Sequence, residues 1–146
     1  MGLSKRMENR MKKKSLVLAT TNMHKIREIK GVLKPLFDFD YLSLIDFPGY
    51  ESPEETETTF EGNAFLKATQ AAKALDAWVL SEDSGLVVPA LDDKPGVKSA
   101  RFAGPNATAK ENCDKLIELL EGLKEEDRVG YYVSSIVLVS PNGLEK

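Results

Sequence analysis

Short apolar runs alternate with amphipathic helical patterns along this chain, and this alternation constrains the fold more than any other feature. The apolar runs predict strands at residues 16–19, 41–45, 78–80 and 128–140. Apolar side chains at helical spacing predict helices at residues 24–33, 59–75 and 107–120. Strands that alternate with helices are typical of an α/β fold, which we therefore predict for this chain.

Length and composition fit one globular domain without a membrane segment. The chain has 146 residues, of which 42% are hydrophobic and 29% charged, ordinary proportions for a soluble protein. No apolar run approaches the roughly 20 residues needed to cross a bilayer, and no apolar leader precedes Ser15. The single cysteine, Cys113, allows no internal disulfide, which indicates a reducing, cytoplasmic location. We expect Cys113 to pack beside Leu116 and Ile117 on a helix.

Charge is distributed unevenly between the N-terminus and the rest of the chain. The net charge is −3, but residues 1–14 carry six basic side chains and one acidic side chain. We expect this basic arm to be solvated and disordered, and residues 15–146 to form the folded domain. A nucleic-acid-binding module built on the arm is the weakest alternative, because such modules need a broad basic face. We therefore expect neither a nucleic-acid nor a membrane partner.

Two carboxylates and a hydroxyl follow the third predicted strand. Glu82, Asp83 and Ser84 come directly after the apolar run that ends at Leu80. Ligands of open α/β sheets bind beyond the carboxyl ends of the strands, and adjacent carboxylates repel each other unless a cation or solvent offsets their charge. This acidic turn therefore predicts a metal ion and a phosphate. The alternative is a solvated turn in which Asp83 bonds to the amides that follow it.

A second polar turn, residues 20–25, joins the first predicted strand to a helix. A helix N-terminus offers backbone amides and a favourable dipole to an anion, and Thr20, Asn22 and Lys25 add polar groups there. The alternative is that Asn22 only caps the helix and Lys25 is solvated. His24 is the only histidine, so a multi-histidine metal site is excluded and a surface position is expected.

An acidic segment precedes and enters the longest predicted helix. Several glutamates between residues 54 and 61 stand where acids favour a helix dipole, which is the simplest explanation for most of them. One or two carboxylates are nevertheless enough for Mg²⁺ when substrate phosphates complete its shell. Asn63 and Lys67 are four residues apart and share a helical face, either as ligand contacts or as an exposed polar stripe.

Residues 87–104 are predicted to be a long loop because prolines and glycines interrupt them. Arg101 within this loop either clamps a phosphate or holds the loop to a carboxylate. A glycine-bounded surface loop would explain the segment equally well.

The last predicted strand lacks an evident hairpin partner. Pro141, Asn142 and Gly143 form a turn signal that asks for a following strand, but the sequence stops three residues later. We therefore expect a domain that is incomplete at its C-terminus.

Four motifs, in order, resemble those of the inosine triphosphate pyrophosphatase family, which removes non-standard purine nucleoside triphosphates. Residues 20–25 match Thr-Gly-Asn-x-x-Lys, with Thr21 in place of the glycine. Residues 55–67 match Glu-Thr-Gly-x-Thr-Phe-x-Glu-Asn-Ala-x-x-Lys, with Glu57 at the glycine and Gly62 at the second glutamate. Residues 82–86 match Asp-Asp-Ser-Gly-Leu, with Glu82 at the first aspartate. Residues 95–104 match Pro-Gly-x-x-Ser-Ala-Arg-Phe/Tyr-Ala/Ser-Gly throughout.

The resemblance implies an activity, a fold and a set of site residues. The activity is Mg²⁺-dependent hydrolysis of inosine, deoxyinosine or xanthosine triphosphate to the monophosphate and pyrophosphate. The fold is a two-lobed α/β body with a long central mixed sheet flanked by helices, and the partner is a second copy in a homodimer. The implied metal ligands are Glu55 and Asp83, and the implied catalytic residues are Asp83, Glu82 and Lys67. The candidate substrate contacts are Thr20, Thr21, Asn22, Met23, His24, Lys25, Asn63, Ser84 and Arg101.

Departures from the family pattern leave two alternatives open. The family continues to a Gly-Phe-Gly-Tyr-Asp-Pro segment and a Ser-His-Arg segment that recognise the base, and neither occurs in these 146 residues. One alternative is therefore a truncated, weakly active or inactive form that binds a nucleotide or a partner. The other is a septum-formation-type nucleotide pyrophosphatase, against which the intact motif at residues 95–104 argues.

Overall fold

The computed structural model describes residues 14–142, which fall into two compact units. Within these residues, the first unit comprises 14–54, 65–81 and 137–142, and the second comprises 55–64 and 82–136. The predicted N-terminal arm lies outside the described residues except for Lys14, which is exposed just before the first strand. No helix among the described residues is long and apolar enough to span a membrane.

A parallel arrangement of three strands forms the sheet of the first unit. Strand β1 (Ser15–Leu18) pairs in parallel with β2 (Asp40–Ser43) and with the start of β3 (Trp78–Val88). The register places Leu16 opposite both Tyr41 and Trp78. These strands lie at the predicted apolar runs, although residues 44 and 45 belong to the 3-10 turn that follows β2. Three consecutive residues of β1 are buried, because helices cover both faces of the sheet. A short 3-10 helix, η1 (Leu44–Asp46), follows β2.

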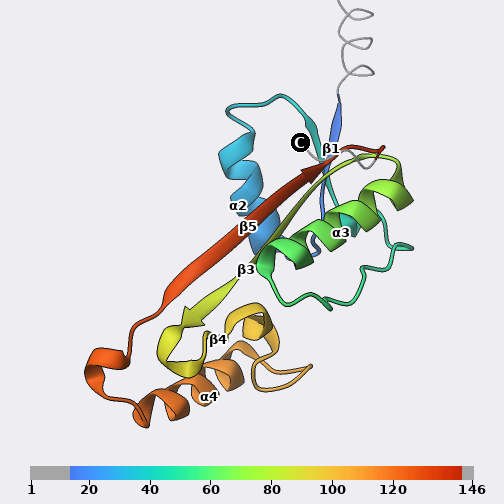
Figure 1. Cartoon of the computed structure of the whole chain (residues 1–146). Helices are drawn as coiled ribbons and strands as arrows, with labels where there is room; N and C mark the ends of the chain where they lie inside the picture. Colours follow the sequence, from blue (N-terminus) through green and yellow to red (C-terminus); the bar gives the residue numbers. More distant parts are fainter. Residues whose placement is uncertain (1–13, 143–146) are drawn as a thin grey trace, which may run out of the picture. The chain divides into compact units, whose positions relative to one another are not determined.

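Helices cover both faces of this sheet. Figure 1 shows α2 (Met23–Leu33) and the later part of α3 (Phe60–Leu75) on opposite sides of the strands. Ile26 of α2 packs with Leu16, Leu18 and Tyr41 in a buried cluster. The face of α3 consists of fully buried small residues, namely Ala64, Ala68, Ala71 and Ala72. Small side chains let a helix approach a neighbouring element closely, as the sequence predicted.

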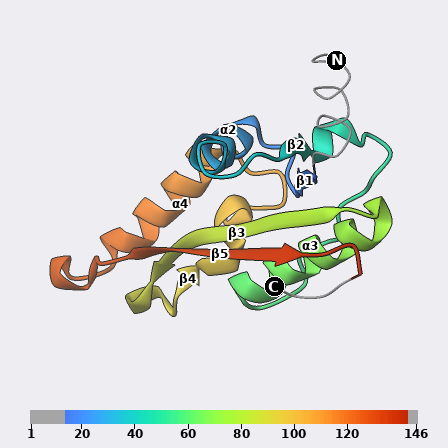
Figure 2. The ribbon, with the colours of Figure 1, turned by 90° about the horizontal axis from the view of Figure 1, so that it is seen from above.

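The second unit is built around the continuation of β3. Val87 and Val88 pair antiparallel with the two-residue strand β4 (Lys94–Pro95), so the five-stranded sheet is mixed, as predicted. Strand β5 (Tyr131–Val139) also pairs with β3. Figure 2 shows β5 beside β3, and the arrowheads in Figure 1 show that the two strands run in opposite directions. The remaining elements are η2 (Pro89–Leu91), η3 (Gly96–Arg101), α4 (Ala109–Glu121) and η4 (Glu125–Asp127).

Two sequence-based expectations for this unit are wrong. Residues 87–104 are not one loop, because Val87 and Val88 complete β3 and the elements η2, β4 and η3 follow. The helical elements stay short because the prolines and glycines of this segment disfavour longer helices. Cys113 is exposed and does not pack into a core, since α4 has no buried residue. Strand β5 pairs with the earlier strand β3, whereas the hairpin partner that the turn signal at residues 141–143 asks for would lie outside the described residues.

The start of α2 provides a first testable prediction, for its cap. The Asn22 side chain accepts hydrogen bonds from the amides of His24 and Lys25, so the predicted N-cap is confirmed. We expect Asn22→Ala to lower the free energy of unfolding by about 1 kcal/mol, measured by urea denaturation. Asn22→Asp should retain wild-type stability, because aspartate caps helices equally well. Equal losses in the two variants would contradict a capping role.

Candidate functional site

The acidic motif lies inside a strand, and the predicted acidic turn is therefore wrong. Glu82, Asp83 and Ser84 occupy the middle of β3, which continues for eight residues past Leu80. Beyond the motif, Val87 and Val88 pair with β4, and β5 also pairs with β3, so strand pairing from later segments overrides a local composition that favours a turn. Asp83 is only 8% exposed, whereas Glu82 and Ser84 are half-buried.

Strand geometry separates the two neighbouring carboxylates. Successive side chains of a strand point to opposite faces, so Glu82 and Ser84 share one face while Asp83 and Gly85 share the other. The two carboxylates are therefore not forced together, and their repulsion is no longer an argument for a shared cation. Asp83 lies on the more buried face and is therefore better suited than Glu82 to a role that requires low solvent access.

Gly85 allows η3 to approach β3 closely. A Cβ atom at this position would lie 2.5 Å from the Gly96 carbonyl oxygen and 2.5 Å from Ser99 Oγ. The Ser99 hydroxyl donates to the Gly96 carbonyl at 2.6 Å and accepts from the Leu86 amide at 3.0 Å. The bond from Leu86 fastens η3 to the strand directly after the acidic motif, and the bond to Gly96 lies within η3 and fixes the Ser99 hydroxyl.

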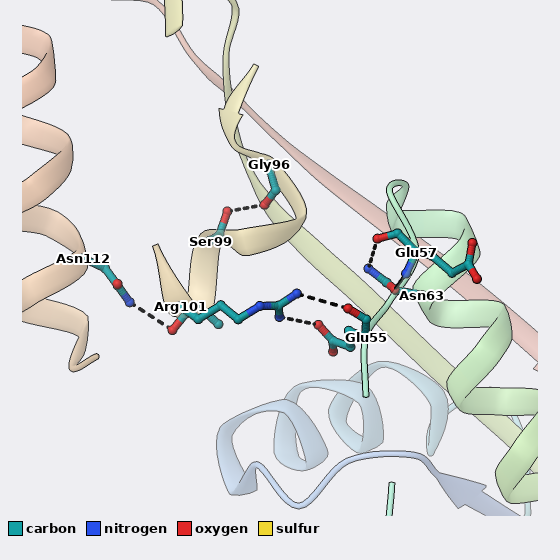
Figure 3. Close-up of polar contacts among 8 residues, drawn as sticks. Glu55, Glu57, Asn63, Gly96, Ser99, Arg101 and Asn112 are labelled. Atoms are coloured by element: carbon teal, nitrogen blue, oxygen red, sulfur yellow. Dashed lines mark hydrogen bonds and ion pairs between the residues drawn. The ribbon is translucent and has the colours of Figure 1, made fainter. Parts of the chain in front are cut away.

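Arg101, at the end of η3, holds Glu55. Its Nη1 atom lies 2.9 Å from Glu55 Oε2, and Nη2 donates to the Glu55 carbonyl oxygen at 3.3 Å (Figure 3). The side chains are 32% and 26% exposed, so the pair is partly shielded from water. Of the two interpretations that the sequence left open for Arg101, the structure contains the contact with a carboxylate.

Asn63 holds the same acidic segment at a second point. Its side chain is fully buried, its Oδ1 accepts from the Glu57 amide at 3.0 Å, and its Nδ2 donates to the Glu57 carbonyl at 3.3 Å (Figure 3). Gly62 next to it is closely surrounded, since a Cβ would lie 2.9 Å from Thr59 Oγ1 and 3.0 Å from Glu57 Cβ. A side chain at this position would require the side chains of Thr59 and Glu57 to shift.

The polar turn of the first unit is organised around its own backbone. The Asn22 side chain accepts from the His24 amide at 2.9 Å and from the Lys25 amide at 3.4 Å. Thr20 Oγ1 accepts from the Asn22 amide at 3.0 Å. The intervening candidate side chains, Thr21 to His24, are exposed, as expected for His24. Lys67, the remaining candidate of the first unit, is half-buried on α3.

The donor chemistry of the second unit fits Mg²⁺. Residues 14–142 contain no cluster of three or more His, Cys, Asp or Glu side chains that would hold a metal without further ligands. Mg²⁺ does not need such a cluster, because one or two carboxylates and the substrate phosphates suffice. Glu55 and Asp83 are oxygen donors of the required kind, and both belong to the second unit.

Two residues that shape this unit were not singled out from the sequence. Ser99 lies inside the motif at residues 95–104, so its place in that motif could have marked it as a functional residue. Asn112 lies in α4 outside every motif, and nothing in its local pattern indicated that it bonds to residues nine and twelve positions earlier.

Comparison with protein families finds one match that covers most of the chain. The model of the Ham1 family matches residues 16–146. The chain is 52% identical over 132 residues to the dITP/XTP pyrophosphatase of Protochlamydia amoebophila, covering 90% of this chain and 66% of that protein. It is 47% identical over 128 residues to the Exiguobacterium protein of the same name, covering 88% and 64%. The chain thus spans slightly less than two thirds of the length of these curated relatives.

Solved structures extend the similarity to the fold. A HAM1 protein from Coxiella burnetii matches with a TM-score of 0.81 at 35% identity, over 91% of this chain and 68% of that one. The Ham1 protein of Staphylococcus aureus matches with a TM-score of 0.78 at 37% identity, over 91% and 67%. These matches confirm the predicted α/β fold with a mixed central sheet.

Proposed function

The chain belongs to the Ham1 family, and from this membership we propose that it hydrolyses non-standard purine nucleoside triphosphates. The substrates are inosine, deoxyinosine and xanthosine triphosphate, and the products are the monophosphate and pyrophosphate. The observation that carries the proposal is the 52% identity, over 132 residues, to a protein named dITP/XTP pyrophosphatase. Removal of such nucleotides prevents their incorporation into nucleic acid.

The proposed roles follow the motif matches residue by residue. In the first unit, residues 20–25 contact the triphosphate and Lys67 stabilises negative charge on it. In the second unit, Glu55 and Asp83 hold Mg²⁺, Glu82 supports them, and Ser84 contacts phosphate. Asn63 and Arg101 remain candidate substrate contacts, although their side chains are bonded to Glu57 and Glu55 in this structure.

The side chains of the chain supply the proton chemistry in this proposal. Asp83 accepts the proton of the attacking water, for which its place on the buried face of β3 is favourable, because few waters compete for its carboxylate. Lys25 and Lys67 stabilise the charge that develops on the leaving pyrophosphate. Mg²⁺, when bound, neutralises the phosphates and lowers the pKa of a coordinated water.

The products distinguish this activity from other nucleotide hydrolysis. We expect the chain, incubated with Mg²⁺ and inosine or xanthosine triphosphate, to release pyrophosphate and the monophosphate, resolved by anion-exchange chromatography. Adenosine and guanosine triphosphates serve as controls and should be cleaved more slowly. Release of single phosphates would contradict the proposed reaction. Binding of inosine triphosphate without turnover would favour a nucleotide-binding protein instead.

The proposal includes an assembly and a compartment. The family resemblance supports a homodimer, and sedimentation of the purified chain would test it.

The single, exposed Cys113 supports a reducing compartment such as the cytoplasm, because no internal disulfide is possible.

A further inference from the structure

One side chain of α4 holds the backbone on both sides of Arg101. Asn112 Nδ2 donates to the Ala100 carbonyl at 3.0 Å, and the Ala103 amide donates to Asn112 Oδ1 at 2.8 Å. Figure 3 shows Asn112 reaching from its helix to the segment that carries Arg101. Both polar ends of one amide are therefore used to hold a single short stretch of chain.

Neighbouring contacts strengthen this attachment. Lys115, three residues further along α4, donates from Nζ to the Phe102 carbonyl at 2.8 Å, and its Nζ lies 4.4 Å from the centre of the Phe102 ring. On the other side, Ser99 fastens the start of η3 to β3. The backbone of Arg101 is thus held from α4 and from β3, which limits where its guanidinium group can lie.

Arg101 in turn limits the position of Glu55. The acidic segment around Glu55 belongs to no helix or strand, so side-chain contacts must determine its conformation. The Arg101 fork donates to both the carboxylate and the carbonyl oxygen of Glu55, a two-point contact that fixes orientation as well as distance.

We propose that Asn112 is a positioning residue for Glu55 and acts through Arg101. Its effect on the metal site rests on the proposed function, in which Glu55 is a ligand of Mg²⁺. Residues that orient a metal ligand without touching the metal typically change the metal affinity about 10- to 100-fold when they are replaced. Replacing Asn112 should therefore weaken metal binding, although the residue lies in α4 and belongs to none of the four motifs.

The first test measures the order of Glu55 without any metal. Asn112→Leu has a similar branched shape but removes both hydrogen bonds, whereas Asn112→Asp keeps the acceptor for the Ala103 amide and loses the donor. Cys113→Ala, at the adjacent exposed position of α4, is the matched control. We expect the NMR order parameter of the Glu55 amide to fall in Asn112→Leu, to fall less in Asn112→Asp and to stay unchanged in the control.

The second test measures Mn²⁺ affinity by electron paramagnetic resonance, with the metal alone and no nucleotide. We expect about tenfold weaker binding for Asn112→Leu and at least as large a loss for Arg101→Gln. The double variant should bind no more weakly than Arg101→Gln, because Asn112 acts only through Arg101. Additive losses would show that Asn112 acts independently of Arg101 and would overturn the proposal.

The outcomes separate this inference from the proposed activity. An unchanged Glu55 order parameter in Asn112→Leu would overturn the positioning role, whatever the wild-type chain does with nucleotides. A loss of order together with a coupled loss of Mn²⁺ affinity would support the role even if no pyrophosphate were released. If the wild-type chain bound no Mn²⁺, the order parameters alone would decide the positioning role and the assigned metal ligands would be wrong.

Discussion

Asp83→Asn is expected to lower the rate of pyrophosphate release from inosine triphosphate by at least about a hundredfold at saturating Mg²⁺. Asparagine has nearly the same shape as aspartate, so the buried position on β3 remains filled. It accepts no proton at neutral pH and carries no charge to hold a cation, so both proposed roles of Asp83 are removed together. The measurement is kcat from initial rates, with circular dichroism to verify that the strand structure is retained.

A matched variant separates this loss from a general effect of removing an acidic charge. Asp92 is exposed and belongs to the same unit, and its φ of 55° is one that asparagine also adopts readily. Asp92→Asn should therefore retain wild-type kcat and stability. A folded Asp83→Asn variant with near wild-type kcat would rule out Asp83 as the proton acceptor. Equal losses in the two variants would attribute the effect to charge rather than to the site.

Local patterns were sufficient for the elements that are held by near neighbours in sequence. The apolar runs before residue 81 and the helical spacing that follows them predicted β1, α2, β2 and α3 to within about two residues, which is the usual uncertainty of element ends. Asn22 was identified as an N-cap because the capping contact joins residues two and three positions apart. Such features depend on contacts between residues that are close in the sequence, so a local sequence pattern is enough to predict them.

Pairing between distant segments caused the main errors. Ser81 to Gly85 have the composition of a turn, but β3 continues through them to Val87 and Val88, which pair with β4. Strand β5, later in the chain, also pairs with β3. Strand pairing of this kind depends on which segments meet in space, and a local window does not contain that information. The same limit explains the exposed Cys113, whose helix was recognised although its burial was not.

Site residues were predictable in identity but not in their contacts. Glu55, Asn63 and Arg101 were selected from motifs, yet their hydrogen bonds join positions up to 46 residues apart. Arg101 shows the difference most clearly, since its sequence neighbourhood was compatible with a phosphate or with a carboxylate. In the sequence, α3, β3, η2 and β4 separate Glu55 from Arg101. In space, Arg101 Nη1 lies 2.9 Å from Glu55 Oε2.

Gly85→Ala is expected to destabilise the protein by about 1–3 kcal/mol, because the added methyl group has no space. It would lie 2.5 Å from a backbone oxygen of Gly96, 2.5 Å from Ser99 Oγ and 2.8 Å from Phe60 Cε1. The backbone oxygen cannot rotate away as a flexible side chain can, so η3 must move off β3. Because η3 carries Arg101, we also expect Glu55 to lose order. The measurement is the urea midpoint, together with the order parameter of the Glu55 amide.

Gly31→Ala is the matched control for this substitution and should have the opposite sign. Gly31 lies in the exposed part of α2, and a Cβ there would have no heavy atom within 4 Å. Alanine favours a helix over glycine by roughly 0.5–1 kcal/mol, so Gly31→Ala should raise the urea midpoint. A Gly85→Ala variant as stable as wild type would mean that η3 is not fixed to β3 at this point. The close approach at Gly85 would then play no part in holding Arg101, and the contacts that Asn112 and Lys115 make from α4 would hold its segment instead.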